Sequence, residues 1–163
     1  MDNIILEKMK KENNLDGLFL MKDANIRYTS GFTGDDSYIL ISPEEKLFIT
    51  DARYTEQAQT ECKNFTVENW KKNNSPLESF IAEKVQALGI KRLGFEKDGM
   101  SYDLYDKLTK SMPSVELIPT NGIVESLRYV KSEFEIQCIA KAASFADEAF
   151  KKILDFIKPG LTE

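Results

Sequence analysis

The sequence predicts an α/β domain of three layers, in which a mixed β-sheet of about six strands lies between helices. Short apolar runs of the length of buried strands alternate along the chain with segments whose apolar residues recur at helical spacing. One pair of strands is joined by a short turn that begins with Ser42-Pro43, which makes these two strands antiparallel and the sheet mixed. The strands are expected at 17–21, 38–41, 47–50, 65–70, 91–96 and 115–119.

The chain is expected to begin with a helix over 2–13, followed by its first strand. Ile5, Leu6 and Met9 recur at helical spacing among charged residues. The apolar run after Asp16 is short and bounded by charges, which is typical of a buried strand.

The next segment contains a short helix and a hairpin. We expect the helix over 23–30, with Asp23 or Asn25 as its N-cap. A loop rich in turn-forming residues follows at 31–36, and the two strands of the hairpin come after it.

The middle of the chain continues the alternation of helices and strands. A helix is expected over 52–62, and the strand after it alternates apolar and polar residues as a half-exposed strand does. A further helix is expected to begin at Ser75-Pro76, with Ser75 as N-cap, and to end at Gly89. The last helix before the final strand is expected over 101–112.

After Asn121-Gly122 the pattern changes to one long amphipathic helix. Ser132 and Glu135 have the spacing of a capping box, and Lys158-Pro159-Gly160 ends the helix. Its apolar stripe has no later partner in the chain, so it must cover the preceding domain, meet another subunit or face a missing domain. The stripe consists of Ile136, Ile139, Ala143, Ala146, Phe150, Ile153 and Ile157. We therefore predict a domain over 1–126 and a linker with a first helix of a further domain over 127–163.

Composition predicts a folded cytoplasmic protein. The 163 residues include 22 Lys and Arg against 27 Asp and Glu, and the resulting net charge of -5 argues against binding to nucleic acid or to anionic membranes. We also expect no signal peptide and no membrane span. Cys62 and Cys138 are far apart in the sequence, which favours reduced, buried thiols over a disulfide framework.

The chain contains no histidine, and this restricts its possible chemistry. Ser-His-Asp triads, Cys-His pairs and His-ligated zinc are excluded. One alternative is a stand-alone enzyme that binds Mg²⁺ through Asp35, Asp36 and Asp51. Aspartates also serve as turn and cap residues, which is the simpler interpretation. The glycines Gly31 and Gly34 lack the context of a phosphate-binding loop and indicate a turn.

Two stretches of the sequence resemble a known family. The segment 25–34, read with 50–54 after the hairpin, resembles the N-terminal domain of Xaa-Pro aminopeptidases, prolidases and creatinase. The segment 127–136 is similar to the entry into the first long helix of that family's pita-bread catalytic domain. The resemblance covers nearly the whole chain and leaves dipeptidase, aminopeptidase and creatine-type hydrolase open.

The resemblance implies a domain without catalytic residues of its own. The family hydrolyses the bond before proline with two divalent metal ions, often manganese, whose ligands are expected beyond the end of this chain. The chain alone should then be inactive and hold no cofactor. Its partners would be its own catalytic domain, a second copy in a homodimer and, in the full-length protein, a proline-containing peptide.

The resemblance also implies that this domain helps to wall the active-site entrance. The residues expected at the rim of that entrance are Tyr28, Phe32, Asp35, Arg53 and Tyr54. Other roles are open for several of them, since Arg53 could pair locally with Asp51 or Glu56, and Tyr28 and Phe32 could belong to the core. The chain could also be an independent binding module.

Overall fold

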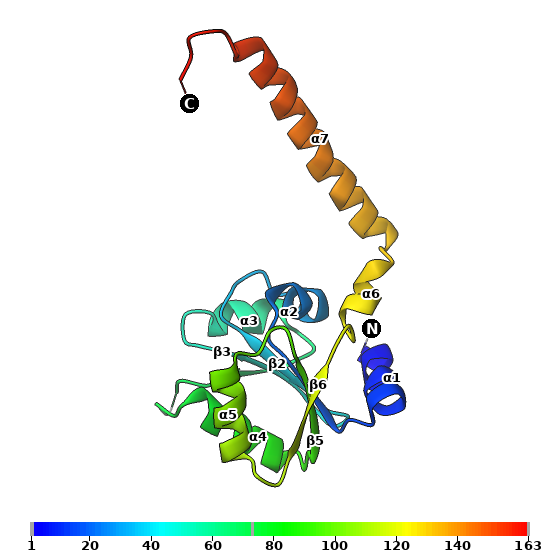
Figure 1. Ribbon diagram of the computed structural model, residues 1–163, viewed down its shortest axis with the longest axis vertical. Helices are drawn as coiled ribbons and strands as arrows, with labels where there is room; N and C mark the ends of the chain where they lie inside the picture. Colours follow the sequence, from blue (N-terminus) through cyan, green and yellow to red (C-terminus); the bar gives the residue numbers. More distant parts are fainter. Residues whose placement is uncertain (1, 73, 163) are drawn as a thin grey trace. The chain divides into compact units, whose positions relative to one another are not determined.

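The computed structural model describes residues 2–72 and 74–162, which form two compact units, one ending at Leu127 and one running from Arg128. The first unit contains a six-stranded sheet in the order β4-β3-β2-β1-β5-β6 (Figure 1). Its strands are β1 (Gly17–Leu20), β2 (Tyr38–Ile41), β3 (Lys46–Thr50), β4 (Thr66–Asn69), β5 (Arg92–Glu96) and β6 (Glu116–Thr120). The predicted strands are all present, with ends that differ by a residue.

The sheet is mixed, as the hairpin predicts. β2 pairs antiparallel with both β1 and β3, whereas β3 with β4, β1 with β5 and β5 with β6 are parallel. Among the described strands, therefore, only β2 is reversed. The carboxyl ends of the other five strands meet at one edge of the sheet, together with the start of β2.

Helices cover both faces of the sheet, which gives the three predicted layers (Figure 1). Alternate residues of each strand point to opposite faces. Leu18 and Leu20 of β1 pack with α1, α2 and α3, and Phe19 between them packs on the other face with α4 and α5. The helices are α1 (Asp2–Asn13), α2 (Asp23–Ser30), α3 (Thr55–Glu61), α4 (Leu77–Ala87) and α5 (Tyr102–Ser111).

Two predicted helix caps are wrong. Ser75 does not cap α4. The N-cap of this helix is Pro76, which has an extended conformation, and no side chain forms a capping hydrogen bond there. Neither Asp23 nor Asn25 caps α2, whose N-cap is Lys22. The structure also contains a short helix that was not predicted, α6 (Glu125–Tyr129), within which the first unit ends.

The second unit contains the long helix α7 (Glu133–Phe156). The predicted capping box is present, since Ser132 accepts a hydrogen bond from the Glu135 N–H and the Glu135 carboxylate accepts one from the Ser132 N–H. Its apolar residues Ile136, Ile139 and Phe150 are exposed, as is Cys138, which corrects the expectation that this thiol is buried. Both cysteines are free.

Within the described residues, no helix is both long and apolar enough to cross a membrane.

Candidate functional site

Most of the predicted rim residues lie near the edge where the carboxyl ends of the strands meet. Asp51 follows β3 directly, and Arg53 and Tyr54 occupy the turn before α3. Asp35 and Asp36 precede β2, whose start lies at the same edge. Ligands of open α/β sheets commonly bind at this kind of edge, so the position alone makes the cluster a candidate site.

Arg53 and Asp51 form the centre of the cluster. The Arg53 Nε–H donates to Asp51 Oδ1 and Oδ2, both at 3.1 Å, and Nη2 donates to Oδ2 at 2.7 Å. The backbone N–H of Arg53 also donates to Oδ1 at 2.9 Å. Asp51 is 4% exposed, whereas 60% of the Arg53 side chain is exposed. A buried carboxylate therefore holds an exposed guanidinium in one orientation.

The charges of the cluster stabilise one another. The hydrogen bond from Arg53 holds the pKa of Asp51 well below its usual range; burial acts in the opposite direction, and Lys71, with Nζ 3.2 Å from Asp51 Oδ2, assists the lowering. The Asp51 carboxylate in turn raises the pKa of Arg53, with Asp36 contributing. Two carboxylates and two cations balance, so the cluster offers directed hydrogen bonds rather than a strong net field.

The two aspartates of the loop have different surroundings. Asp36 accepts from Arg53 Nη2 at 2.7 Å, and its side chain is 66% exposed. Its backbone has a φ of 48°, a left-handed conformation that Asp and Asn tolerate better than most residues. Asp35 is exposed, and its backbone carbonyl accepts from the Ser37 hydroxyl at 2.9 Å.

The three aromatic residues differ in exposure. Phe32 is 1% exposed and packs edge-on against Phe48 and Tyr54, with ring centroids 4.8 and 5.9 Å away. Tyr54 is half-buried, and the Arg53 guanidinium lies 5.3 Å from its ring centroid. Tyr28 is half-buried, and its hydroxyl donates to the Leu127 carbonyl at 3.1 Å. Phe32 thus belongs to the core, and its ring packs against the ring of Tyr54.

Gly34 allows the loop to close over these rings. A Cβ at this position would lie 2.6 Å from Phe32 Cζ, closer than real Cβ contacts come, and 3.1 Å from Tyr54 Cδ1, so that the rings would have to shift. Gly31 ends α2 with a φ of 80°, a conformation that favours glycine. The two glycines thus allow the predicted turn, and Gly34 also allows the loop to pack closely against the rings of Phe32 and Tyr54.

The sequence did not predict the residues that hold the loop 31–36 to α3. The Thr33 N–H and hydroxyl both donate to the Glu61 carboxylate of α3, the N–H at 2.8 Å. Gln57, one turn earlier on α3, donates to both of them at 3.0 Å. Two hydrogen bonds lower the pKa of Glu61: the one from Gln57 has the larger effect, and the one from the Thr33 N–H the smaller. The spacing of Gln57 and Glu61 on one helix face was the available signal.

The alternative of a magnesium site has no support in the arrangement of the aspartates. Asp36 and Asp51 converge on Arg53, and Lys71 takes a further position on Asp51. Within residues 2–72 and 74–162, no group of three or more acidic, Cys or His side chains could hold a metal ion.

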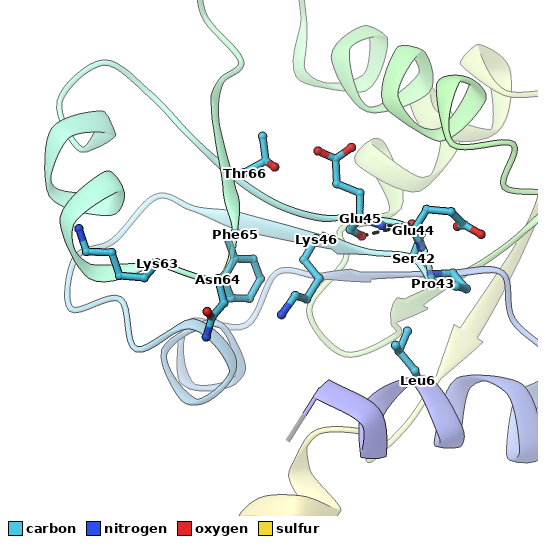
Figure 2. Close-up of a pocket in the computed structure, with 10 residues that line it drawn as sticks. All are labelled: Leu6, Ser42, Pro43, Glu44, Glu45, Lys46, Lys63, Asn64, Phe65 and Thr66. Atoms are coloured by element: carbon cyan, nitrogen blue, oxygen red, sulfur yellow. Dashed lines mark hydrogen bonds between the residues drawn. The ribbon is translucent and has the colours of Figure 1, made fainter.

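A separate open pocket of about 450 Å³ lies between the β2–β3 turn and the segment that enters β4. Figure 2 shows that its charged groups do not converge, since the Glu45 carboxylate and the Lys46 ammonium point in opposite directions. Lys46 Nζ lies 5.1 Å from the centroid of the Phe65 ring, and Lys63, which follows α3, donates to the carbonyl of Gln59 in that helix. The pocket therefore presents no common chemical focus.

Comparison with known proteins agrees with this fold and places the chain in a family. Residues 5–130 match the family described as the Creatinase/Prolidase N-terminal domain. The chain belongs to this family.

Particular relatives are peptidases by name. The uncharacterized peptidase YqhT of Bacillus subtilis is 40% identical over 161 residues, which are 97% of this chain and 45% of YqhT. The Xaa-Pro dipeptidase of Pyrococcus horikoshii is 32% identical over 170 residues, covering 99% of this chain and 45% of that protein. The solved structure of an Xaa-Pro dipeptidase from Bacillus anthracis has a TM-score of 0.89 and 36% identity, covering 99% of this chain and 44% of that one. This chain thus spans less than half the length of these relatives.

Proposed function

We propose that this chain is the non-catalytic N-terminal domain of a proline-specific metallopeptidase, an Xaa-Pro aminopeptidase or Xaa-Pro dipeptidase. In that protein it supports homodimer formation and walls the entrance of the active site. The observation that carries the proposal is the family match over residues 5–130, combined with relatives that are named Xaa-Pro dipeptidases and are more than twice as long.

The remainder of the protein supplies the chemistry in this proposal. Two divalent metal ions, manganese in our proposal, would be bound by residues beyond this chain and would activate water for hydrolysis. Residues 127–163 form the linker and first helix of that catalytic domain, which would cover the exposed apolar residues of α7. The whole protein would act in the cytoplasm on proline-containing peptides.

The rim residues would limit the size and orientation of the substrate. Nε and Nη2 of Arg53 donate to Asp51 and Asp36, and among the described residues no hydrogen bond from Nη1 is present. Nη1 could donate to a carbonyl or to the terminal carboxylate of a peptide substrate. Tyr54 and Asp35 would lie beside the same part of that peptide. Tyr28 would line the entrance with its exposed part, and Phe32 would keep Tyr54 in place.

Activity measurements test the proposal directly. The full-length protein with Mn²⁺ should hydrolyse an Xaa-Pro dipeptide or an Xaa-Pro-Xaa tripeptide, and the 163-residue chain should hydrolyse neither. Light scattering should give the mass of a dimer for the full-length protein. Activity in the 163-residue chain, or none in the full-length protein, would sink the proposal.

Replacing Arg53 by Ala in the full-length protein tests the rim. Loss of one exposed charge-assisted hydrogen bond should raise KM about three- to tenfold with little change in kcat. Arg92→Ala is the matched control, because Arg92 is also paired with an exposed carboxylate, that of Glu116, but lies at the amino end of β5. Equal effects of the two substitutions would argue against a rim role for Arg53.

A further inference from the structure

A second polar cluster lies at the same edge of the sheet, at the ends of β1 and β5. Glu96, the last residue of β5, is 5% exposed. Its Oε2 accepts from the backbone N–H groups of Met21 and Lys22 at 2.6 and 2.8 Å, and its Oε1 accepts from the Asn25 side chain. A remote carboxylate thus satisfies the N–H groups that enter α2.

Asn25 links this carboxylate to a second one. Its side chain is fully buried, and Nδ2 donates both to Glu96 Oε1 and to Glu125 Oε1, the latter at 2.9 Å. An amide nitrogen carries two hydrogens, so these bonds use its whole donor capacity. Asn25 therefore joins β5 to the start of α6 through a buried bridge.

Lys22 closes the cluster from the solvent side. Its Nζ lies 2.6 Å from Glu125 Oε1 and 2.9 Å from Asp98 Oδ2. Burial acts to raise the pKa of Glu125, but the hydrogen bonds from Lys22 and Asn25 outweigh it and the pKa is lowered. The same two carboxylates raise the pKa of Lys22. The ion pair is thus charged at neutral pH.

The cluster is attached to the segment by which the chain leaves the first unit. Within residues 122–127, which follow β6, Ile123 and Val124 are buried in the core, and the Leu127 carbonyl accepts from the Tyr28 hydroxyl. The space enclosed between this segment and Glu96 is about 10 Å³, at the lower limit for a single water molecule. Apolar packing and hydrogen bonds therefore hold the segment closely.

We propose that Glu96, Asn25, Glu125 and Lys22 form a polar lock that fixes residues 122–127 to the sheet and to α2. Glu125 is the positioning residue of this lock, because it is the group within residues 122–127 that both Asn25 and Lys22 bind. The consequence for catalysis rests on the proposed function: the lock would fix the direction in which the chain continues toward the catalytic domain.

Hydrogen exchange in the 163-residue chain tests the lock without any activity. Glu125→Ala removes the acceptor of two hydrogen bonds, and amides within 123–129 should exchange about ten- to a hundredfold faster while those of β2 are unchanged. Glu116→Ala is the matched control, because Glu116 is an exposed, paired carboxylate on the preceding strand. Unchanged exchange in 123–129, or equal acceleration in β2, would overturn the proposal.

A conservative variant and the full-length protein separate positioning from general stability. Glu125→Gln keeps an acceptor oxygen and should give exchange between that of the wild type and that of Glu125→Ala. In the full-length protein, Glu125→Ala should raise KM several-fold with kcat little changed. Unchanged KM beside faster exchange would refute the positioning role. If the wild type hydrolyses no Xaa-Pro peptide, the proposed function fails while exchange still decides on the lock.

Discussion

Replacing Asp51 by Asn tests whether a buried carboxylate fixes the candidate rim. The substitution keeps the shape and leaves Oδ1 to accept from the Arg53 N–H, but it places an amide where Arg53 Nη2 and Lys71 Nζ now donate. A hydrogen bond to a charged group contributes about 1.5–3 kcal/mol. Both cations are more than half exposed and regain water, so the loss should stay below the roughly 3–5 kcal/mol of a broken buried pair. We expect about 2–3 kcal/mol.

Asp36→Asn provides the matched control. Asp36 binds the same Arg53 Nη2 at the same 2.7 Å, but its side chain is exposed, and exposed ion pairs contribute about 0–1 kcal/mol. Its left-handed backbone suits Asn as well as Asp. The two substitutions therefore differ mainly in the burial of the carboxylate.

Urea unfolding followed by tryptophan fluorescence measures both variants. Trp70 is the single tryptophan, and its backbone N–H donates to the carbonyl of Thr50, the residue before Asp51, at 3.1 Å. With a slope of about 2 kcal/mol per molar urea, Asp51→Asn should lower the midpoint by about 1–1.5 M and Asp36→Asn by less than about 0.5 M. Equal shifts, or a loss below about 0.5 kcal/mol for Asp51→Asn, would refute the reasoning.

The difference in unfolding free energy between the wild type and Asp51→Asn has a defined dependence on pH. The folded pKa of Asp51 lies below its unfolded value of about 3.9. Its stabilising contribution is therefore complete above the unfolded pKa and is lost as pH falls toward the folded one. The difference between wild type and Asp51→Asn should be constant from about pH 7 to pH 5 and smaller by about 1 kcal/mol at pH 3.

Three further outcomes follow from other contacts. Gly34→Ala places a methyl group against two aromatic rings and should destabilise the first unit by about 1–3 kcal/mol, seen as a lower melting temperature; unchanged stability would contradict the packing argument. Ser132→Ala removes the cap of α7 and should lower helix content at 222 nm, with a cost of about 1 kcal/mol, whereas Ser144→Ala within the helix should not. Cys138 should react rapidly with a thiol reagent and Cys62 only on unfolding, because burial raises the pKa of the Cys62 thiol; rapid reaction of both would exclude this.

Apolar patterning predicted the secondary structure well because each strand carries its own signal. The sheet buries alternate residues on two faces, so short apolar runs bounded by charges mark the strands. α6 carries no such signal, since five residues are too few for a periodic pattern and the contacts of Glu125 and Leu127 with the rest of the first unit hold it. Ser75 failed as a cap because Pro76 itself takes the extended N-cap conformation and leaves Ser75 outside the helix.

The candidate site was predictable only where its contacts are local. Asp51 and Arg53 are two residues apart, and their pairing was among the expected alternatives. Lys71 reaches Asp51 because β3 pairs in parallel with β4 in a register that sets Thr50 beside Asn69. No pattern in a single sequence specifies that register. The burial of Phe32 likewise depends on the close approach that Gly34 permits, which residue type alone does not reveal.

Both polar clusters use the same physical device at the carboxyl edge of the sheet. A chain that turns from a strand toward a helix leaves N–H groups unpaired, and a buried carboxylate accepts from them: Asp51 from Arg53, and Glu96 from Met21 and Lys22. Each carboxylate then holds groups nearer the surface. Substitution of a buried acid should therefore displace the exposed residue that it holds, such as Arg53, more than substitution of an exposed acid beside that residue. The reason is that the register of the strands fixes the position of each buried acid.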